Sequence, residues 1–257
     1  MMNRTLVVPC LIGFTASIAS ADQISLRLDE MGAYGIYSIA MDGRLDSGSS
    51  AEVNYIDNIT TGERLWTNQY GDEVVTYCIQ IYENVTFGEE HTFDMHQDLT
   101  EVPESPPYPG PMNEAQAGLV NDLYARFIDT TSGYLMDGTA LTDQFDYETA
   151  ASAFQLVVWE IINENIGDVT INDAASQLSL ELGAFRADLA DSNDTSEAAN
   201  LIMSALGENR WLNTNGNVIG LTNPARQDQL MVVPLPMPGI LAGIGLVGAA
   251  FLRRKLR

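Results

Sequence analysis

The chain changes its hydrophobic period once, and a proline-rich segment marks the change. Residues 102–111, VPESPPYPGP, hold five prolines in ten positions, and such a segment cannot join a β-ladder because proline lacks a backbone donor. Before it, apolar and polar residues alternate in short runs, as in β-strands. After it, apolar residues recur every three or four positions, as in amphipathic helices. The sequence therefore predicts a β-rich stretch followed by a helical one.

The β-rich stretch contains several runs bounded by turn signals. The expected strands cover residues 24–28, 34–41, 52–56, 76–82 and 91–95. Turns are expected at Asp42-Gly43 and Thr61-Gly62, because glycine after a small polar residue favours a reversal of the chain.

The second stretch predicts four helices and a return to strands. The expected helices cover residues 114–129, 147–165, 173–190 and 196–207, and strand-like runs follow at residues 217–221 and 228–234. Asn113 and Asp146 are N-cap residues for the first two helices, and Asp194 and Glu197 have capping-box spacing near the fourth.

A helical stretch between β segments is typical of an α+β fold rather than of alternating α/β units. We expect a β-rich barrel or sandwich subdomain built from residues 23–111 and 208–233. A helical subdomain from residues 113–207 is inserted between them.

The first 21 residues are typical of a secretory signal peptide. Arg4 provides the positive start, an apolar run follows from Leu6, and small residues occupy positions 19–21. The apolar run is short for a membrane-spanning helix. We expect export, with cleavage after Ala21 and loss of Cys10.

Residues 234–257 form a three-part tail. A proline cluster at 234–238 leads into a short apolar transmembrane segment at 240–252 and a basic cluster at 253–257. This tail resembles the PEP-CTERM sorting signal of Gram-negative bacteria, which implies recognition by an exosortase after a transient stay in the inner membrane. Leu235 stands where that family has its central glutamate, which resembles a known variant of the signal. A plain membrane anchor is the alternative, with the basic cluster on the cytoplasmic side.

The chain is strongly acidic, with 35 Asp and Glu against 12 Lys and Arg and a formal net charge of −23. Such a surface repels phosphate backbones, and this argues against a nucleic-acid partner. Between the two ends, the chain has seven arginines and no lysine. If both ends are removed, its only primary amine is therefore its own N-terminus.

Cys78 is the one cysteine that remains after export, and it lies in a predicted strand. An odd cysteine in a secreted protein indicates an intermolecular disulfide or a reactive thiol, although a free cysteine is also often a small buried apolar side chain. Gln155 is the polar exception on an apolar helix. A buried amide without a partner costs roughly 1–3 kcal/mol, so Gln155 requires a hydrogen-bond partner, such as a strand edge.

The strand segment 77–79, YCI, and the helix segment 154–160, FQLVVWE, together resemble the thioester domain of bacterial surface proteins, also called the TQXA or Cys-Gln domain. The resemblance covers residues 22–233. It implies an internal thioester between Cys78 and Gln155 at the interface of a β subdomain and a helical one. The chain departs from the Thr-Gln-x-Ala pattern at its first and fourth positions, which do no bond chemistry.

In such a domain, the Cys78 thiolate attacks the Gln155 side-chain carbonyl and ammonia leaves. A target amine or hydroxyl then takes the acyl group in a single turnover, so the protein is a covalent tether for adhesion or matrix anchoring rather than an enzyme. Tyr77 and Trp159 are expected to shield the bond from water. No cofactor is required, and the absence of lysine leaves no side chain that quenches the thioester.

Two other functions are open. One is a structural exopolysaccharide or biofilm matrix protein with an unreactive Cys78, and the other is a secreted cysteine hydrolase that pairs Cys78 with His91 or His96. The two histidines lie five residues apart in a predicted strand and face opposite sides, which disfavours a metal site. The acidic run at residues 189–197 lacks the pattern of an EF-hand loop and is expected to cap a helix.

Overall fold

A computed structural model describes residues 23–41, 55–81, 83–104, 110–207 and 218–233. The expected signal peptide, the sorting tail and the turn at Asp42-Gly43 lie outside these residues. Within them, one antiparallel sheet has the strand order β2-β3-β7-β6-β4-β1-β5. Its strands are β1 (Gln23–Met41), β2 (Ile56–Asn68), β3 (Glu73–Cys78), β4 (Glu90–His96), β5 (Phe185–Asp188), β6 (Val218–Asn223) and β7 (Arg226–Val232).

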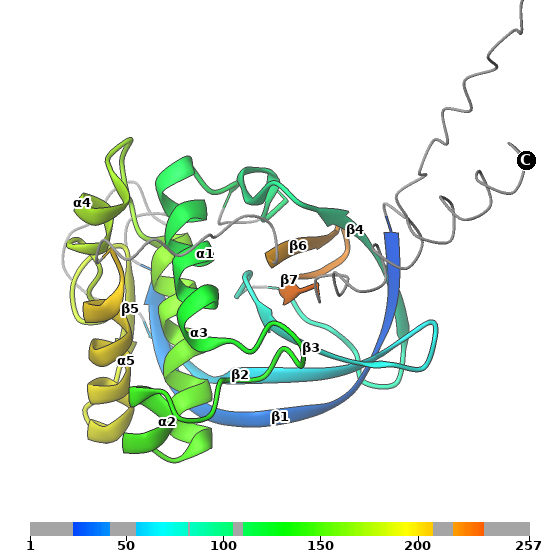
Figure 1. The fold of residues 1–257 in the computed structure, drawn as a ribbon, viewed down its shortest axis with the longest axis horizontal. Helices are drawn as coiled ribbons and strands as arrows, with labels where there is room; N and C mark the ends of the chain where they lie inside the picture. Colours follow the sequence, from blue (N-terminus) through cyan, green and yellow to red (C-terminus); the bar gives the residue numbers. More distant parts are fainter. Residues whose placement is uncertain (1–22, 42–54, 82, 105–109, 208–217, 234–257) are drawn as a thin grey trace, which may run out of the picture.

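The long strand β1 closes the sheet on itself. It pairs with β4 near its start, with β2 along most of its length and with β5 at its end. Figure 1 shows β1 and β2 curving together beneath the short strands β6 and β7. The sheet is therefore curved, and its strands β1 and β2 contact helix α3 of the helical part of the chain.

The helices gather on one side of the sheet (Figure 1). They are α1 (Glu114–Phe127), α2 (Ala140–Gln144), α3 (Tyr147–Asn163), α4 (Ile171–Ala175) and α5 (Asn193–Ala205), with a 3-10 turn η1 at Leu99–Glu101. Helix α3 packs against β1 and β2 and also against α5. The expected α+β class, a large antiparallel sheet with accompanying helices, is confirmed. No helix in the described ranges has the length and apolarity that a membrane crossing requires.

Helix α3 is the most deeply buried helix segment. Asp146 caps it by accepting from the backbone N–H of Thr149 at 2.9 Å, as the sequence predicts. Its residues from Ala150 to Asn163 are all buried. Asn113 caps α1 through the reciprocal bonds of a capping box with Gln116, so the second predicted cap is also confirmed.

One expected strand break and one expected turn are wrong. β1 runs unbroken from Gln23 to Met41, where two separate strands over residues 24–28 and 34–41 were expected. A Cβ at Gly32 would lie 2.8 Å from the Glu63 side chain, and one at Gly35 would lie 2.8 Å from Ser152 Oγ. These glycines allow close packing within a strand. Thr61-Gly62 likewise lies inside β2 rather than in a turn.

The expected helix over residues 173–190 is also wrong. Helix α4 stops at Ala175, and β5 pairs with the end of β1. Gly183 has φ +109°, and its missing side chain makes room for Glu164, whose carboxylate accepts from the Ala184 N–H at 2.7 Å. This segment therefore pairs with the free edge of β1 as a strand, although its sequence has a helical pattern.

The fourth expected helix is confirmed as α5, but its predicted cap is wrong. The helix begins after Ser192, which makes no side-chain capping bond. Asp194 and Glu197 lie inside the helix instead. The returning strands β6 and β7 match the two runs predicted after the helices.

Replacing Gly62 by alanine is expected to destabilise the protein by about 2 kcal/mol or more. Gly62 has φ +126°, and an added Cβ would lie 2.2 Å from the backbone oxygen of Ala33. Gly71→Ala is the matched control, since Gly71 has φ +88° with no atom within 4 Å of an added Cβ, and only the backbone strain of about 1 kcal/mol applies. Urea unfolding of both variants measures the difference, and equal losses would contradict it.

Candidate functional site

Cys78 is the last residue of β3, at a point where the sheet loses one partner. β2 pairs with β3 only as far as Arg64 and Thr76, while β7 continues alongside Cys78. The N–H of the next residue, Ile79, donates to the backbone oxygen of Asp228 in β7 at 3.0 Å. Because successive N–H groups of a strand point to opposite edges, the N–H of Cys78 faces the side that β2 has left.

The side chain of Gln155, from α3, fills that side. Its Oε1 accepts from the Cys78 N–H at 3.1 Å, and its Nε2 donates to the Cys78 backbone oxygen at 2.8 Å. The amide therefore pairs with Cys78 as a neighbouring strand would. The Cys78 Sγ lies 3.6 Å from the same Oε1, and both residues have no exposed surface.

Burial and two neighbours set the acidity of the thiol. Loss of water raises the pKa of Cys78, because the thiolate is poorly solvated inside the protein. The guanidinium of Arg64 and the indole N–H of Trp159 oppose that rise by favouring the thiolate. Trp159 Nε1 and the Nε and Nη1 atoms of Arg64 have no hydrogen-bond partner of normal geometry.

Trp159 and Tyr77, the two expected shielding residues, lie in different surroundings. Trp159 is one helical turn after Gln155, fully buried, and packs against Phe185 with ring centroids 6.4 Å apart. Tyr77 is also buried, with its ring 4.6 Å from that of Phe154. A shielding role stays a prediction for both residues, with Trp159 the one that influences the thiol.

The far side of Tyr77 meets a buried carboxylate. Glu63 accepts hydrogen bonds from the hydroxyls of Tyr77 and Tyr147 at 3.2 and 2.7 Å. Burial raises the pKa of Glu63, while these hydroxyls and the Ala33 N–H oppose the rise. The carboxylate thus has partners, and it ties β2, β3 and the start of α3 together beside the site.

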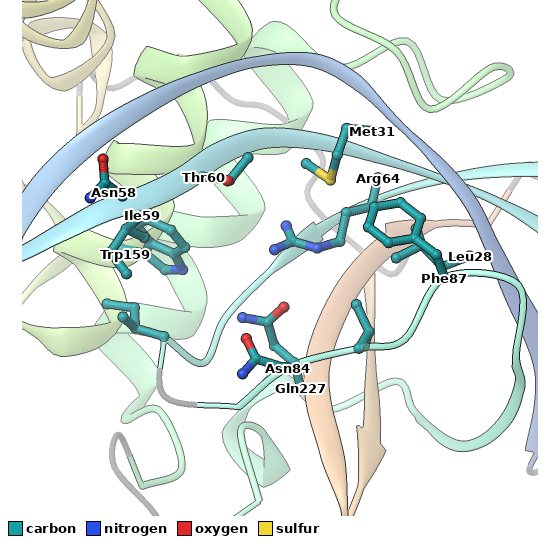
Figure 2. Close-up of a pocket in the computed structure, with 12 residues that line it drawn as sticks. Leu28, Met31, Asn58, Ile59, Thr60, Arg64, Asn84, Phe87, Trp159 and Gln227 are labelled. Atoms are coloured by element: carbon teal, nitrogen blue, oxygen red, sulfur yellow. The ribbon is translucent and has the colours of Figure 1, made fainter.

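A pocket of about 250 Å³ opens beside Arg64 and Trp159, the two side chains that act on the thiol. Figure 2 shows the Arg64 guanidinium pointing into it toward Trp159, with Phe87, Asn84 and Gln227 around it. Cys78 and Gln155 do not line the pocket. Arg64 and Trp159 therefore stand between the buried pair and the space outside.

Sequence reasoning did not identify Arg64 or Glu63 as part of this site. Both lie in the segment Gly62 to Trp66, GERLW, which was expected to follow a turn. One available signal was the placement of Arg64 two residues before Trp66, since alternate residues of a strand share a face. A charged residue that shares a face with tryptophan is a candidate for a buried functional cation.

The other sequence candidates lie apart from the thiol. His91 is close to Arg226, with the two side-chain nitrogens 3.4 Å apart, while His96 bonds Glu101 and Thr222 at 2.8 and 2.9 Å. Neither histidine is among the groups that shift the pKa of Cys78. Within the described ranges, no three His, Cys, Asp or Glu side chains form a group able to hold a metal.

Comparison of the chain with protein-family models, with curated proteins and with solved structures finds no significant match. The geometry around Cys78 and Gln155 is therefore the basis for assigning a function.

Without Gln155, Cys78 is expected to be a slow free thiol. In Gln155→Ala, iodoacetamide should alkylate the folded protein at pH 8 more slowly than the urea-unfolded protein, because only the thiolate reacts. Since burial raises the pKa of Cys78, the folded rate should keep rising at pH values where the unfolded rate, set by the ordinary thiol pKa of about 8.5, has already levelled off.

The added change Arg64→Gln tests the opposing charge. It should move the pH profile of alkylation further upward, because the group that favours the thiolate is gone. For Gln155→Ala, identical pH profiles of alkylation in the folded and the unfolded protein would contradict a raised pKa of Cys78.

Proposed function

We propose that Cys78 and Gln155 form an internal thioester, through which the exported protein attaches itself once and covalently to a nucleophile on a surface or in a matrix. The observation that carries this proposal is the docking of the Gln155 amide on Cys78, with the sulfur 3.6 Å from the amide oxygen. In this reading, residues 113–207 act as a helical subdomain, and the bond joins it to the sheet.

The hydrogen bonds of the amide suit its conversion to an acyl-sulfur bond. When sulfur attacks the side-chain carbon of Gln155, the oxygen gains negative charge, and the Cys78 N–H already points at it from 3.1 Å. The thiol proton passes to the amide nitrogen, which leaves as ammonia. Arg64 supports the attack because it favours the thiolate.

The acyl-transfer step balances in the same way. An incoming amine or hydroxyl adds to the thioester carbonyl, its proton passes to the sulfur, and the Cys78 thiol is released. The acyl group of former Gln155 is left as an amide or ester on the target. Because nothing regenerates the thioester, each molecule reacts once, which distinguishes it from a turnover enzyme.

The rival functions have less support. A cysteine hydrolase needs a base near its thiol, and His91 and His96 are occupied by Arg226, Glu101 and Thr222 instead. A matrix protein with an inert thiol would use Gln155 only to dock α3 on the sheet. Export through the signal peptide and processing of the tail by an exosortase are proposed from the sequence for all three functions.

The mass of the intact protein tests the thioester. The mature wild type is expected to lack the mass of one ammonia, and Cys78→Ala should show the full calculated mass. Methylamine should add once to the wild type and not to Gln155→Ala. A wild-type protein of full mass whose thiol is freely alkylated after unfolding would rule out the thioester.

Trp159→Leu is expected to shorten the lifetime of the thioester in water by about tenfold, because the side chain between the pocket and the sulfur becomes smaller. Phe185→Leu is the matched control. Phe185 packs on Trp159 but does not line the pocket, so it loses similar packing without opening that route. The measurement is the rate at which the protein gains the mass of one water, and equal rates in the two variants would remove the shielding role of Trp159.

A further inference from the structure

Arg64 is a buried cation with no anionic partner among the described residues. Its residue is 7% exposed, and its Nε and Nη1 atoms have no hydrogen-bond partner. None of the ion pairs among the described residues includes it. A buried charge is costly unless it is paired, so a guanidinium kept in this state is a candidate for ligand binding.

The lining of the pocket that the Arg64 side chain enters is unsuited to a cationic ligand. None of the described residues that line the pocket is acidic, although the chain contains 35 acidic residues. Its polar lining consists of Arg64, the amides of Asn58, Asn84 and Gln227, and the hydroxyl of Thr60. Guanidinium and amide N–H groups are donors that match carboxylate and hydroxyl oxygens.

The size and walls of the pocket limit what it holds. A volume of about 250 Å³ lies just below the roughly 300–1,000 Å³ of drug-sized ligand sites, so it suits a single ring rather than a folded protein surface. Trp159 and Phe87 supply aromatic faces, and Phe87 is 56% exposed at the rim. A polar ring with an apolar face is therefore the kind of group that fits.

Formation of the thioester strengthens the need for an anion. Arg64 favours the thiolate of Cys78, but the sulfur of a thioester is neutral. In that state the guanidinium has no negative partner among the described residues. A ligand that brings a carboxylate would supply one, whereas an ammonium group would be repelled and would have to lose its proton before reacting.

We propose that this pocket selects the acceptor of the thioester, and that the acceptor is a hydroxyl of an acidic sugar whose carboxylate binds Arg64. This inference rests on the proposed thioester for its covalent step. Because Arg64 and Trp159 lie between the pocket and the buried pair, these side chains have to move aside before the sugar hydroxyl adds to the carbonyl of former Gln155. The hydroxyl proton then passes to the sulfur of Cys78, and the product is an ester. Arg64 acts as the specificity-determining residue.

Three methyl glycosides of the same ring size test the selection. They are those of glucuronic acid, glucose and glucosamine, which offer a carboxylate, no charge and an amine. Wild-type protein that has lost ammonia is expected to add the glucuronide about tenfold faster than the glucoside, and faster than the glucosaminide. The adduct should be an ester, which hydroxylamine cleaves. Faster addition of the glucosaminide, as a hydroxylamine-resistant amide, would overturn the proposal in favour of an amine target.

In Arg64→Gln molecules that have lost ammonia, as shown by intact mass, the preference for the glucuronide over the glucoside is expected to disappear. Asn84→Ala is the control that alters the same pocket without changing its charge, and it should keep most of the preference. Equal glucuronide preference in Arg64→Gln and wild type would overturn the role of Arg64.

Binding alone separates this proposal from the thioester itself. Cys78→Ala has no thioester, yet it should bind the methyl glucuronide, as followed by tryptophan fluorescence, and Cys78→Ala with Arg64→Gln should bind it about tenfold more weakly. If the wild type keeps its ammonia but this binding difference holds, the covalent function fails and the pocket assignment stands. If ammonia is lost but the glucuronide neither binds nor reacts preferentially, only the pocket assignment fails.

Discussion

The pairing of the Gln155 amide with the backbone of Cys78 is the interaction on which the rest of the site depends. One side-chain amide occupies both the N–H and the C=O of the last residue of β3, where β2 no longer does so. Burying that backbone without partners would be costly, so the pairing allows the strand end to lie under a helix. It also fixes a carbonyl beside the only cysteine in the described residues.

Around this pair, the protein keeps polar groups in its interior in two different ways. Glu63 is surrounded by hydroxyl and N–H donors, so its burial is compensated and it joins the sheet to α3. Arg64, its neighbour in β2, faces a pocket with no acidic residue among its described lining residues and lacks such compensation. Adjacent residues of one strand point to opposite faces, and this separates a structural charge from one available to a ligand.

Local patterns in the sequence were sufficient for several parts of this arrangement. The apolar period of α3 and the cap at Asp146 were predicted because a helix records its buried face and its first turn in nearby residues. Local patterns were insufficient to predict β5 or the continuity of β1. Gly32 lay outside the expected strands and Gly62 in an expected turn, but both glycines are required by atoms of Glu63 and Ala33 that approach from elsewhere in the chain.

By itself, the sequence determined the α+β class, the helix that carries Gln155 and the strand that carries Cys78, because each follows from residues a few positions apart. It also supplied the resemblance from which a thioester is proposed. Only the tertiary structure decided that the sulfur and the amide oxygen lie 3.6 Å apart and that Arg64 lies beside them with no ion-pair partner among the described residues. The physical reason is that the loss of β2 as a partner at the end of β3, and the burial of a charge, depend on contacts between distant segments.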